Sequence, residues 1–430
     1  MMKKKYNLIV AGAGTAGLMA AWKAAEKGLK VLVVEKKNNL CEALRTTGNT
    51  FRNRSPINGD YVTVEKKNGK AVVHFNNSNF DVPYSGRLIE TFDSYTFSNS
   101  GHIVRTTRKD RPMAYVYNME IFLQDLKEQA QEAGVSFMTG TIALGIEHNK
   151  NSVKLKVKQR ERTSWIEADR LIAADGLNSR IVESLGLNKE RPVVVRGPCF
   201  ETVFEGVDFP YPPGFSFVLG NDMRGGAGFM FVYPHAIGEN SFAVMVNRRF
   251  PAELCPRMID HFITKSLCAD WFNNARPVHH TEAIVTVRPP INPPYAGNVL
   301  FIGDAAAFGE TLVPGALRCG YHAADAVVQE LGGEKGFEGY GEFWATNFDF
   351  VGNPQKQKDY TKILRLYNAL SDSELDFLFK LSEERGPIEM EGESSPFNEY
   401  TAGYAMIDHF MGFSEVQGEL RDKLQMIRDS

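Results

Sequence analysis

Cysteine is scarce in this sequence of 430 residues, and its five cysteines are dispersed along the chain. No two of them stand in a C-x-x-C spacing, which argues against a disulfide framework and against the usual zinc and iron–sulfur sites. Dispersed thiols of this kind are typical of a reducing compartment. We therefore expect a cytoplasmic protein without structural disulfides.

An excess of charge of either sign is also missing. The chain holds 49 Lys and Arg residues against 52 Asp and Glu residues, so its formal net charge is −3. A general nucleic-acid binder needs a surplus or a stripe of basic side chains to neutralise phosphates. The balance of charge therefore argues against nucleic acid as a partner.

Long hydrophobic runs are absent as well. No stretch reaches the roughly 18 uninterrupted apolar residues of a membrane-spanning helix, which leaves peripheral membrane contact open. Lysines 3–5 and the apolar stretch up to Trp22 are similar to a secretory signal. Three glycines interrupt that stretch, charged residues follow it at once, and no convincing cleavage site is present. We expect a mature N-terminus rather than a signal peptide.

Metal-site and hydrolase motifs are missing too. The nine histidines form no H-x-x-x-H pattern, and the adjacent His279 and His280 would face opposite sides of a strand. No Gly-x-Ser-x-Gly nucleophile is present. We expect neither a metal site nor serine-hydrolase chemistry.

The N-terminal 35 residues carry a β-α-β pattern. Residues 6–11 form an apolar run typical of a buried strand, residues 15–27 predict a helix that ends at Gly28, and residues 30–35 predict a second strand. Parallel strands joined by a helix are typical of nucleotide-binding α/β folds.

A glycine motif joins the first strand to the helix. Gly12 permits a tight turn, Gly14 lets backbone N–H groups approach a pyrophosphate, and Gly17 allows close helix–strand packing. Glu35 stands 35 − 17 = 18 residues after the last glycine, where a carboxylate can bind ribose hydroxyls and would repel a 2′-phosphate. The pattern predicts a dinucleotide site, and the alternative is a glycine-rich turn without a ligand. The predicted cofactor contacts are Gly12, Gly14, Thr15, Ala16, Gly17, Glu35 and Lys36.

The rest of the chain changes character several times. Antiparallel strands are expected over 60–112, where Asn68-Gly69 indicates a hairpin turn, and over about 190–290. The other expected elements are a helix at 118–133, separate strands at 164–167, 170–174 and 298–302, a helix at 316–331, and helices from 337 onward with a polar loop at 384–396.

Two later motifs resemble those of a known family. The segment 299–306 with Pro314-Gly315 is similar to the GD motif of flavoprotein hydroxylases and geranylgeranyl reductases. Residues 171–176 with Ser179-Arg180 are similar to their DG motif. Together with the glycine motif they occur in the order of the para-hydroxybenzoate-hydroxylase-like FAD superfamily. The resemblance covers the chain to about residue 335 and implies FAD as the cofactor.

The resemblance also implies roles for individual residues. Asp304, beside Gly303, would bind the ribityl chain, and N–H groups near Pro314, Gly315 and Ala316 would face the flavin pyrimidine ring. A helix N-cap without a ligand is the alternative for Asp304. Asp175 would also contact the cofactor, and a simple turn at a strand end is its alternative.

Several positions depart from the family pattern. Val182 and Met119 stand where the family usually has arginines, and Ala307 follows the GD motif in place of the common His, Gly or Arg. The tryptophan pair of the halogenases is absent. These departures leave the flavin surroundings and the nicotinamide contacts undetermined.

Two local features resemble the geranylgeranyl reductase branch. Cys41, in the stretch 41–44 after the ribose glutamate, is similar to a flavin-adjacent cysteine and is our candidate catalytic residue; a small buried hydrophobe is the alternative. Arg45 resembles the flavin-contacting arginine at this point in the hydroxylases, or is a surface residue. The stretch 229–234 is similar in aromatic spacing to the Y-x-W-x-F-P motif of these reductases, which lines a lipid-like substrate cavity. On a strand, Phe229, Phe231 and Tyr233 would share one face, and they would line such a cavity or belong to the sheet core.

The predicted fold class is α/β, with a Rossmann-like FAD-binding domain, an inserted antiparallel β-sheet substrate domain and a helical C-terminal region. The FAD-binding domain would comprise 1–59, 113–187 and 286–335, the substrate domain 60–112 and 188–285, and the helical region 336–430.

We predict an FAD-dependent oxidoreductase that acts on a small hydrophobic organic substrate. The main expectation is geranylgeranyl-reductase-like reduction of a C=C bond by flavin hydride. Hydroxylation by a flavin monooxygenase is the alternative, and a flavin-containing binding or escort protein without turnover is a third. No second dinucleotide motif is visible, so NAD(P)H would bind transiently, or a ferredoxin or reduced quinone would donate the electrons.

Overall fold

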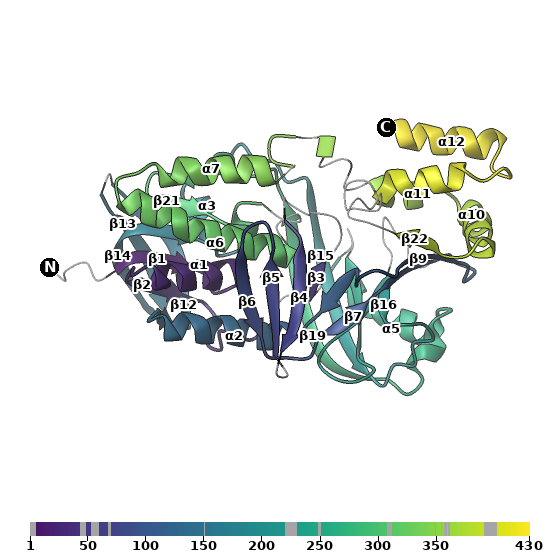
Figure 1. Ribbon diagram of the computed structural model, residues 1–430, viewed down its shortest axis with the longest axis horizontal. Helices are drawn as coiled ribbons and strands as arrows, with labels where there is room; N and C mark the ends of the chain where they lie inside the picture. Colours follow the sequence, from purple (N-terminus) through teal and green to yellow (C-terminus); the bar gives the residue numbers. More distant parts are fainter. Residues whose placement is uncertain are drawn as a thin grey trace.

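The computed structural model places an α/β part and a large antiparallel sheet side by side, with helices of the C-terminal region beyond the sheet (Figure 1). This confirms the predicted fold class. The structure describes residues 6–43, 49–52, 60–67, 70–149, 151–219, 230–247, 251–307, 312–348, 350–353, 355–356, 359, 362–390 and 402–430.

The α/β part is built on a mixed sheet with a parallel centre. Its main strand order is β11-β2-β1-β14-β13-β12, and β21 pairs with the C-terminal half of β14. The strands β11, β2, β1, β14 and β21 are parallel, whereas β13 and β12 continue the sheet antiparallel. The strands are β1 (Tyr6–Ala11), β2 (Val31–Val34), β11 (Ser136–Met138), β12 (Thr141–His148), β13 (Val153–Gln159), β14 (Arg162–Ala173), β20 (Tyr295–Ala296) and β21 (Val299–Phe301). The two short strands predicted at 164–167 and 170–174 were wrong, because they form the single strand β14.

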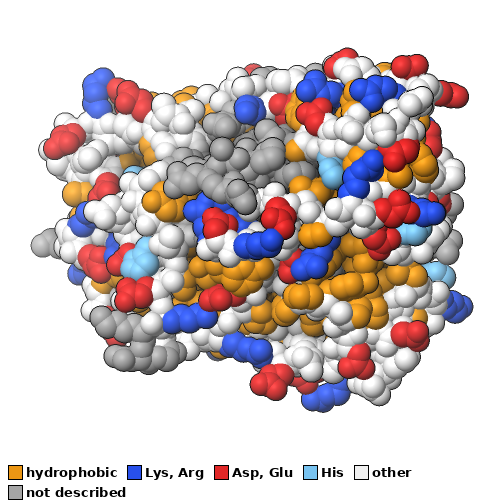
Figure 2. Space-filling model, turned by 45° about the vertical axis from the view of Figure 1, so that its right-hand side comes forward, with side chains coloured by type: hydrophobic (Ala, Val, Ile, Leu, Met, Phe, Trp, Pro, Cys, Tyr) orange, Lys and Arg blue, Asp and Glu red, His pale blue; other side chains and the backbone are white. Residues whose placement is uncertain are grey.

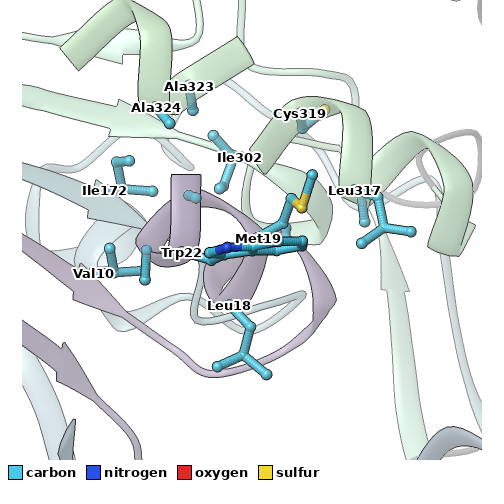
Figure 3. Close-up of a cluster of buried hydrophobic side chains, with 14 of the residues drawn as sticks. Val10, Leu18, Met19, Trp22, Ile172, Ile302, Leu317, Cys319, Ala323 and Ala324 are labelled. Atoms are coloured by element: carbon cyan, nitrogen blue, oxygen red, sulfur yellow. The ribbon is translucent and has the colours of Figure 1, made fainter. Parts of the chain in front are cut away.

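Helices cover this sheet, and two of them pack very closely. A Cβ on Gly320 of α6 would lie 2.4 Å from the carbonyl oxygen of Ala16 in α1, so only glycine permits this approach. Buried side chains of both helices, among them Met19 and Leu317, meet side chains of the strands in one cluster (Figure 3). The helices of this part are α1 (Thr15–Glu26), α2 (Met119–Glu132), α3 (Arg180–Ser184), α6 (Leu312–Leu331) and α7 (Gly336–Asn347).

Two three-stranded sheets lie beside the α/β part. One has the order β4-β5-β6 and the other β3-β10-β7. Strands β4 and β5 pair antiparallel as the hairpin prediction required, and the predicted turn Asn68-Gly69 lies outside the described residues. Apolar side chains of β4–β6 belong to the same cluster as those of α1 and α6, so we propose to count 60–84 with the FAD-binding domain. The strands are β3 (Thr50–Arg52), β4 (Val62–Lys67), β5 (Lys70–Phe75), β6 (Phe80–Tyr84), β7 (Ile89–Thr91) and β10 (Ala114–Val116).

A buried ion pair ties α6 to the β4–β6 sheet. The Arg318 Nε atom lies 3.2 Å from Asp60 Oδ2, and both side chains are almost fully buried. The same Nε donates to Ser78 Oγ at 2.8 Å, and Nη2 donates to Asn347 Oδ1 of α7 at 2.9 Å. One guanidinium therefore joins two helices and a sheet.

The large sheet has the order β19-β15-β18-β17-β16-β8-β9-β22. Its pairs are antiparallel except for β16 with β8 and β22 with β9. The helices α5 (Leu254–Lys265) and η1 (Ala269–Phe272) supply side chains to the cluster on one face. The strands are β8 (Asp93–Phe97), β9 (Ile103–Arg108), β15 (Val195–Glu205), β16 (Gly214–Val218), β17 (Met230–Pro234), β18 (Phe242–Asn247), β19 (Arg276–Val287) and β22 (Ile388–Met390).

The C-terminal region is helical as predicted, with one exception. Helices α9 to α12 share an apolar cluster, to which Val104 and Leu219 of the large-sheet part also contribute. The first helix of the predicted region, α7, instead packs into the cluster of the α/β part. Residues 384–396 were predicted as a loop, but β22 within them pairs with β9, and residues 391–396 lie outside the described residues. Among the described residues, no helix is long and apolar enough to cross a membrane. The helices are α9 (Lys362–Ala369), α10 (Asp372–Glu384), α11 (Ala402–Met411) and α12 (Gly418–Asp429).

Candidate functional site

Four parallel strands of the α/β sheet end at the same level. Ala11 is in register with Val34 on one side and with Ala173 on the other, and Ala173 is in register with Phe301. The residues that follow these strands therefore meet at one edge of the sheet, which is where nucleotides bind in open α/β sheets. The fold brings the glycine turn, Glu35, Asp175 and the Gly303-Asp304 turn to this edge.

The three glycines of the motif meet different surroundings. Gly12 has a φ of +105°, and a Cβ there would lie 2.2 Å from the carbonyl oxygen of Ala174. A Cβ on Gly17 would lie 2.0 Å from the carbonyl oxygen of Gly12. A Cβ on Gly14 would meet no atom within 4 Å. Packing therefore requires glycine at positions 12 and 17. At position 14 the fold has space for a larger side chain.

The start of helix α1 is suited to an anion. Gly14 is its N-cap and has no side chain to accept a hydrogen bond, and the first turn holds no acidic residue. The N–H groups of Thr15, Ala16 and Gly17 are the first of the helix and lack an acceptor within it. With the positive end of the helix dipole they can hold a diphosphate, which fits FAD.

Glu35 is buried beside the glycine turn. One carboxylate oxygen accepts from the Ala13 N–H at 2.7 Å and the other accepts from the Lys37 N–H at 2.9 Å. Each oxygen keeps a lone pair that can accept from a ribose hydroxyl. The ribose role of Glu35 and a contact of Lys36 remain predictions.

Glu35→Gln tests the ribose role. Glutamine has one acceptor oxygen where two N–H groups need one each, so we expect the free energy of unfolding to fall by about 1–3 kcal/mol. We expect FAD affinity to fall about tenfold or more, since a charge-assisted bond to ribose is also lost. Thermal unfolding and FAD titration measure the two effects, and an unchanged FAD affinity would contradict the assignment.

The Gly303-Asp304 turn lies between two helix starts. Gly303 has a φ of +56°, and a Cβ there would lie 3.2 Å from Ala16 Cβ and 4.0 Å from Ala316 Cβ. Ala16 belongs to the first turn of α1, and Pro314, Gly315 and Ala316 lie at the start of α6. Asp304 lies within the short helix η2 (Gly303–Ala305), whose N-cap is Ile302, so the N-cap alternative was wrong.

Asp175 has a structural role and a spare acceptor. Its Oδ2 accepts from the Arg180 N–H at 2.9 Å at the start of α3, in a turn where Gly176 has a φ of +81°. Its Oδ1 is buried and has no hydrogen-bond partner among the described residues. Burial raises the pKa of this carboxyl. A cofactor hydroxyl would satisfy Oδ1, so the turn and the cofactor contact are compatible.

Cys41 is buried in the segment after β2. Its thiol donates to Gln124 Oε1 of α2 at 3.1 Å, and burial raises the thiol pKa. A protonated thiol is a poor nucleophile. The catalytic role remains a prediction, which turnover by Cys41→Ser would test. Arg45 lies outside the described residues.

The second face of the large sheet is aromatic. Phe231 and Tyr233 share it as the alternation predicts, whereas Phe229 lies outside the described residues. The Phe215 and Tyr233 rings stack with centroids 5.7 Å apart, and those of Phe217 and Phe231 are 4.5 Å apart. Phe215, Phe217 and Phe231 are half-buried. We did not predict the two residues of β16, although alternation along 214–218 would have found them.

A groove elsewhere in the α/β part has a volume of about 680 Å³. Residues of α1, β5, β6 and α6 line it, including Trp22, Phe80 and Tyr321. None of the predicted site residues lies in its lining, so this groove is not the predicted cofactor site.

The chain is similar to two proteins that are named as a reductase or as reductase-like. Over 382 residues the chain is 26% identical to the digeranylgeranylglycerophospholipid reductase of Methanocaldococcus jannaschii, covering 87% of this chain and 89% of that protein. Among solved structures it is similar to a geranylgeranyl bacteriochlorophyll reductase-like protein of Thermoplasma acidophilum, with a TM-score of 0.72, 19% identity and 99% of each chain covered.

The same fold occurs in a monooxygenase. The p-nitrophenol 4-monooxygenase of Pseudomonas putida gives a TM-score of 0.59 at 15% identity, with 100% of this chain and 98% of that chain covered. The sequence pattern of the FAD binding domain family matches residues 5–308, which is more than half of the chain. The chain therefore belongs to the FAD binding domain family and is an FAD-dependent oxidoreductase.

Proposed function

We propose that this enzyme reduces carbon–carbon double bonds of an isoprenoid lipid. The observation that carries the proposal is the aromatic, half-buried second face of the large sheet, formed by Phe215, Phe217 and Phe231. An apolar substrate buries favourably against such side chains. The reductase of Methanocaldococcus jannaschii supports the lipid class, since it is similar over most of both chains.

The chain's residues would bind FAD, which supplies the hydride when bound. The first N–H groups of α1 would hold the diphosphate and Glu35 the ribose. Asp304 would bind the ribityl chain, and the start of α6 would lie against the pyrimidine ring. The aromatic face would orient the double bond and exclude water from it.

Hydroxylation by a monooxygenase is the second candidate. The likeness to p-nitrophenol 4-monooxygenase extends over the whole chain, and both reactions need the same FAD site. Anaerobic turnover distinguishes the two. Protein reduced with dithionite is mixed with a lipid carrying geranylgeranyl chains, and flavin absorbance and lipid mass are followed. Flavin oxidation with a gain of two hydrogens per double bond supports reduction; a requirement for oxygen overturns it.

The electron donor and the membrane contact are also proposals. NAD(P)H, a ferredoxin or a reduced quinone would reduce the flavin transiently. Exposed apolar side chains in the large-sheet part, such as Leu254, Leu267 and Ile284, and the hydrophobic side chains that gather on one side of the molecule (Figure 2) support peripheral contact with lipid. Sedimentation with anionic and neutral vesicles tests this contact.

A charge on the aromatic face tests the substrate site. We expect Phe231→Asp to lower kcat/KM for the lipid at least tenfold, because a carboxylate disfavours an apolar chain beside it, with FAD affinity unchanged. Phe377→Asp, at a side chain of α10 that is 41% exposed, is the control and should leave both values unchanged. Equal kcat/KM values for the two variants would contradict the proposal that the substrate binds against the aromatic face.

A further inference from the structure

A polar cluster interrupts the aromatic face of the large sheet. Thr281 of the edge strand β19 is in register with Glu201, Glu201 with Met245, Met245 with Phe231, and Phe231 with Phe217. This row passes from two polar side chains at the sheet edge to apolar ones in its middle. A buried glutamate in such a row calls for a specific reason, since charged groups are rarely buried without a partner.

The neighbouring row explains how Glu201 reaches across the sheet. It places Val203, Ala243 and Tyr233 on adjacent strands. Ala243 is small, so the Tyr233 hydroxyl bonds directly to Glu201 Oε2 across the intervening strand. On the other side Thr281 Oγ1 donates to Glu201 Oε1 at 3.4 Å.

The cluster is deeply buried. The exposed fractions are 2% for Glu201, 1% for Tyr233 and 4% for Thr281. The three side chains form a hydrogen-bonded row that leads from the edge strand to the aromatic half of the face. Phe215, half-buried and stacked on Tyr233, lies over the phenol ring.

Within the part of the chain that the structure describes, no lysine or arginine forms an ion pair with Glu201. The titratable side chains nearby are Cys199 of the same strand, Tyr233 of β17, His235 directly after β17, and His279 of β19. The Asn49 amide lies 3.0 Å from His235 Nε2, and burial lowers the His235 pKa to about 4, so this ring is neutral at pH 7. Burial raises the Glu201 pKa to about 7. The carboxyl therefore carries a proton in most molecules at pH 6 and loses it as the pH rises through about 7.

We propose that Tyr233 and Glu201 supply the proton that completes reduction of the double bond. The proposal rests on the proposed function. If the lipid displaced the Phe215 ring, the Tyr233 hydroxyl could contact the lipid. Tyr233 would then be the catalytic acid, and Glu201 a positioning and relay residue that acts through Tyr233.

As the alkene π bond breaks, one carbon would receive the hydride that FAD supplies when bound and reduced, and the other carbon would receive the Tyr233 proton, so the alkene would be reduced and the flavin oxidised. Glu201 would return a proton to the phenolate oxygen and would regain one from the solvent. A dihydronicotinamide or another two-electron reductant restores reduced FAD.

Infrared spectroscopy tests the state of Glu201 without any turnover. We expect a carbonyl band of a protonated carboxyl at pH 6 that weakens through pH 7 and is missing in Glu201→Gln. The folded-state pKa of about 7 exceeds the usual 4.5, so the folded protein holds the extra proton. The unfolding free energy of the native protein should therefore fall, relative to Glu201→Gln, as pH rises from 4.5 to about 7. A Glu201 carboxyl without this band at pH 6 would overturn the proposal.

Turnover of the reduced holoenzyme with the geranylgeranyl lipid tests the role. We expect Tyr233→Phe and Glu201→Gln to lower kcat about 100-fold or more, with FAD affinity unchanged, and the native kcat to fall above pH 7. The matched controls are Tyr95→Phe, a buried tyrosine that bonds to the Pro212 carbonyl, and Glu205→Gln on the same strand. Both should keep native kcat.

The outcomes separate the two proposals. A native enzyme that reduces the lipid, with Tyr233→Phe and Glu201→Gln equally active, overturns the proton donor alone. A native enzyme that leaves the lipid unreduced overturns the proposed function and the proton donor with it.

Discussion

Gly14→Val is expected to abolish FAD binding while the protein stays folded. A Cβ at this position meets no atom within 4 Å, and the backbone φ of −75° is open to any residue. The valine side chain would occupy the space in front of the first N–H groups of α1, where a diphosphate needs close backbone approach. We expect the dissociation constant for FAD to rise at least 100-fold, measured by flavin fluorescence titration of the apoprotein.

Two further glycine variants serve as controls. Gly339→Val in α7 also places its Cβ in open space and should leave both folding and FAD affinity unchanged. Gly12→Val should prevent folding, because its Cβ would lie 2.2 Å from the Ala174 carbonyl oxygen at a φ of +105°. If the folded Gly14→Val protein still bound FAD tightly, the glycine turn would not be part of the cofactor site.

Arg318→Met is expected to lower the free energy of unfolding by about 3–5 kcal/mol. The substitution leaves Asp60 buried, with an exposed side-chain fraction of 2% and no guanidinium beside it, and uncompensated buried charges cost about this much. Asp60 would still accept from the Tyr61, Asn77 and Ser78 N–H groups. Urea unfolding of the apoprotein at pH 7 measures the loss.

A double variant separates the charge from the packing. Asp60→Asn in the Arg318→Met background removes the unpaired charge and keeps an acceptor for part of the N–H groups, so we expect a stability above that of Arg318→Met alone. Arg365→Met in α9, at an exposed side chain, is the control. An Arg318→Met protein as stable as this control would show that the ion pair adds nothing to stability.

The local part of the FAD-binding site could be predicted from the sequence. Gly12, Gly17 and Glu35 act within one β-α-β unit, so their spacing alone places them at the end of the sheet. The Gly303-Asp304 turn lies about 290 residues further on and was found only through a resemblance. Its position between α1 and α6 depends on the parallel pairing of β21 with β14, which no local pattern encodes.

Features that depend on distant pairing could not be predicted. Glu201 reads as an ordinary polar residue of a strand, and its burial follows only from its register with Thr281 and from the reach of Tyr233. Arg318 likewise reads as one charge on a helix, and its partner Asp60 is more than 250 residues away in the sequence. Ile388–Met390 is short and polar at its centre, so nothing local indicates that β9 pairs with it.

That last pairing has a consequence for growth of the large sheet. β22 pairs with β9 along its outer side. A chain truncated before Ile388 would leave the backbone N–H and C=O groups on that side of β9 without strand partners. Unpaired strand borders recruit identical strands from other molecules. Shortened chains should therefore assemble into higher oligomers or precipitate. In the full chain, the three-residue strand would protect the sheet from self-association.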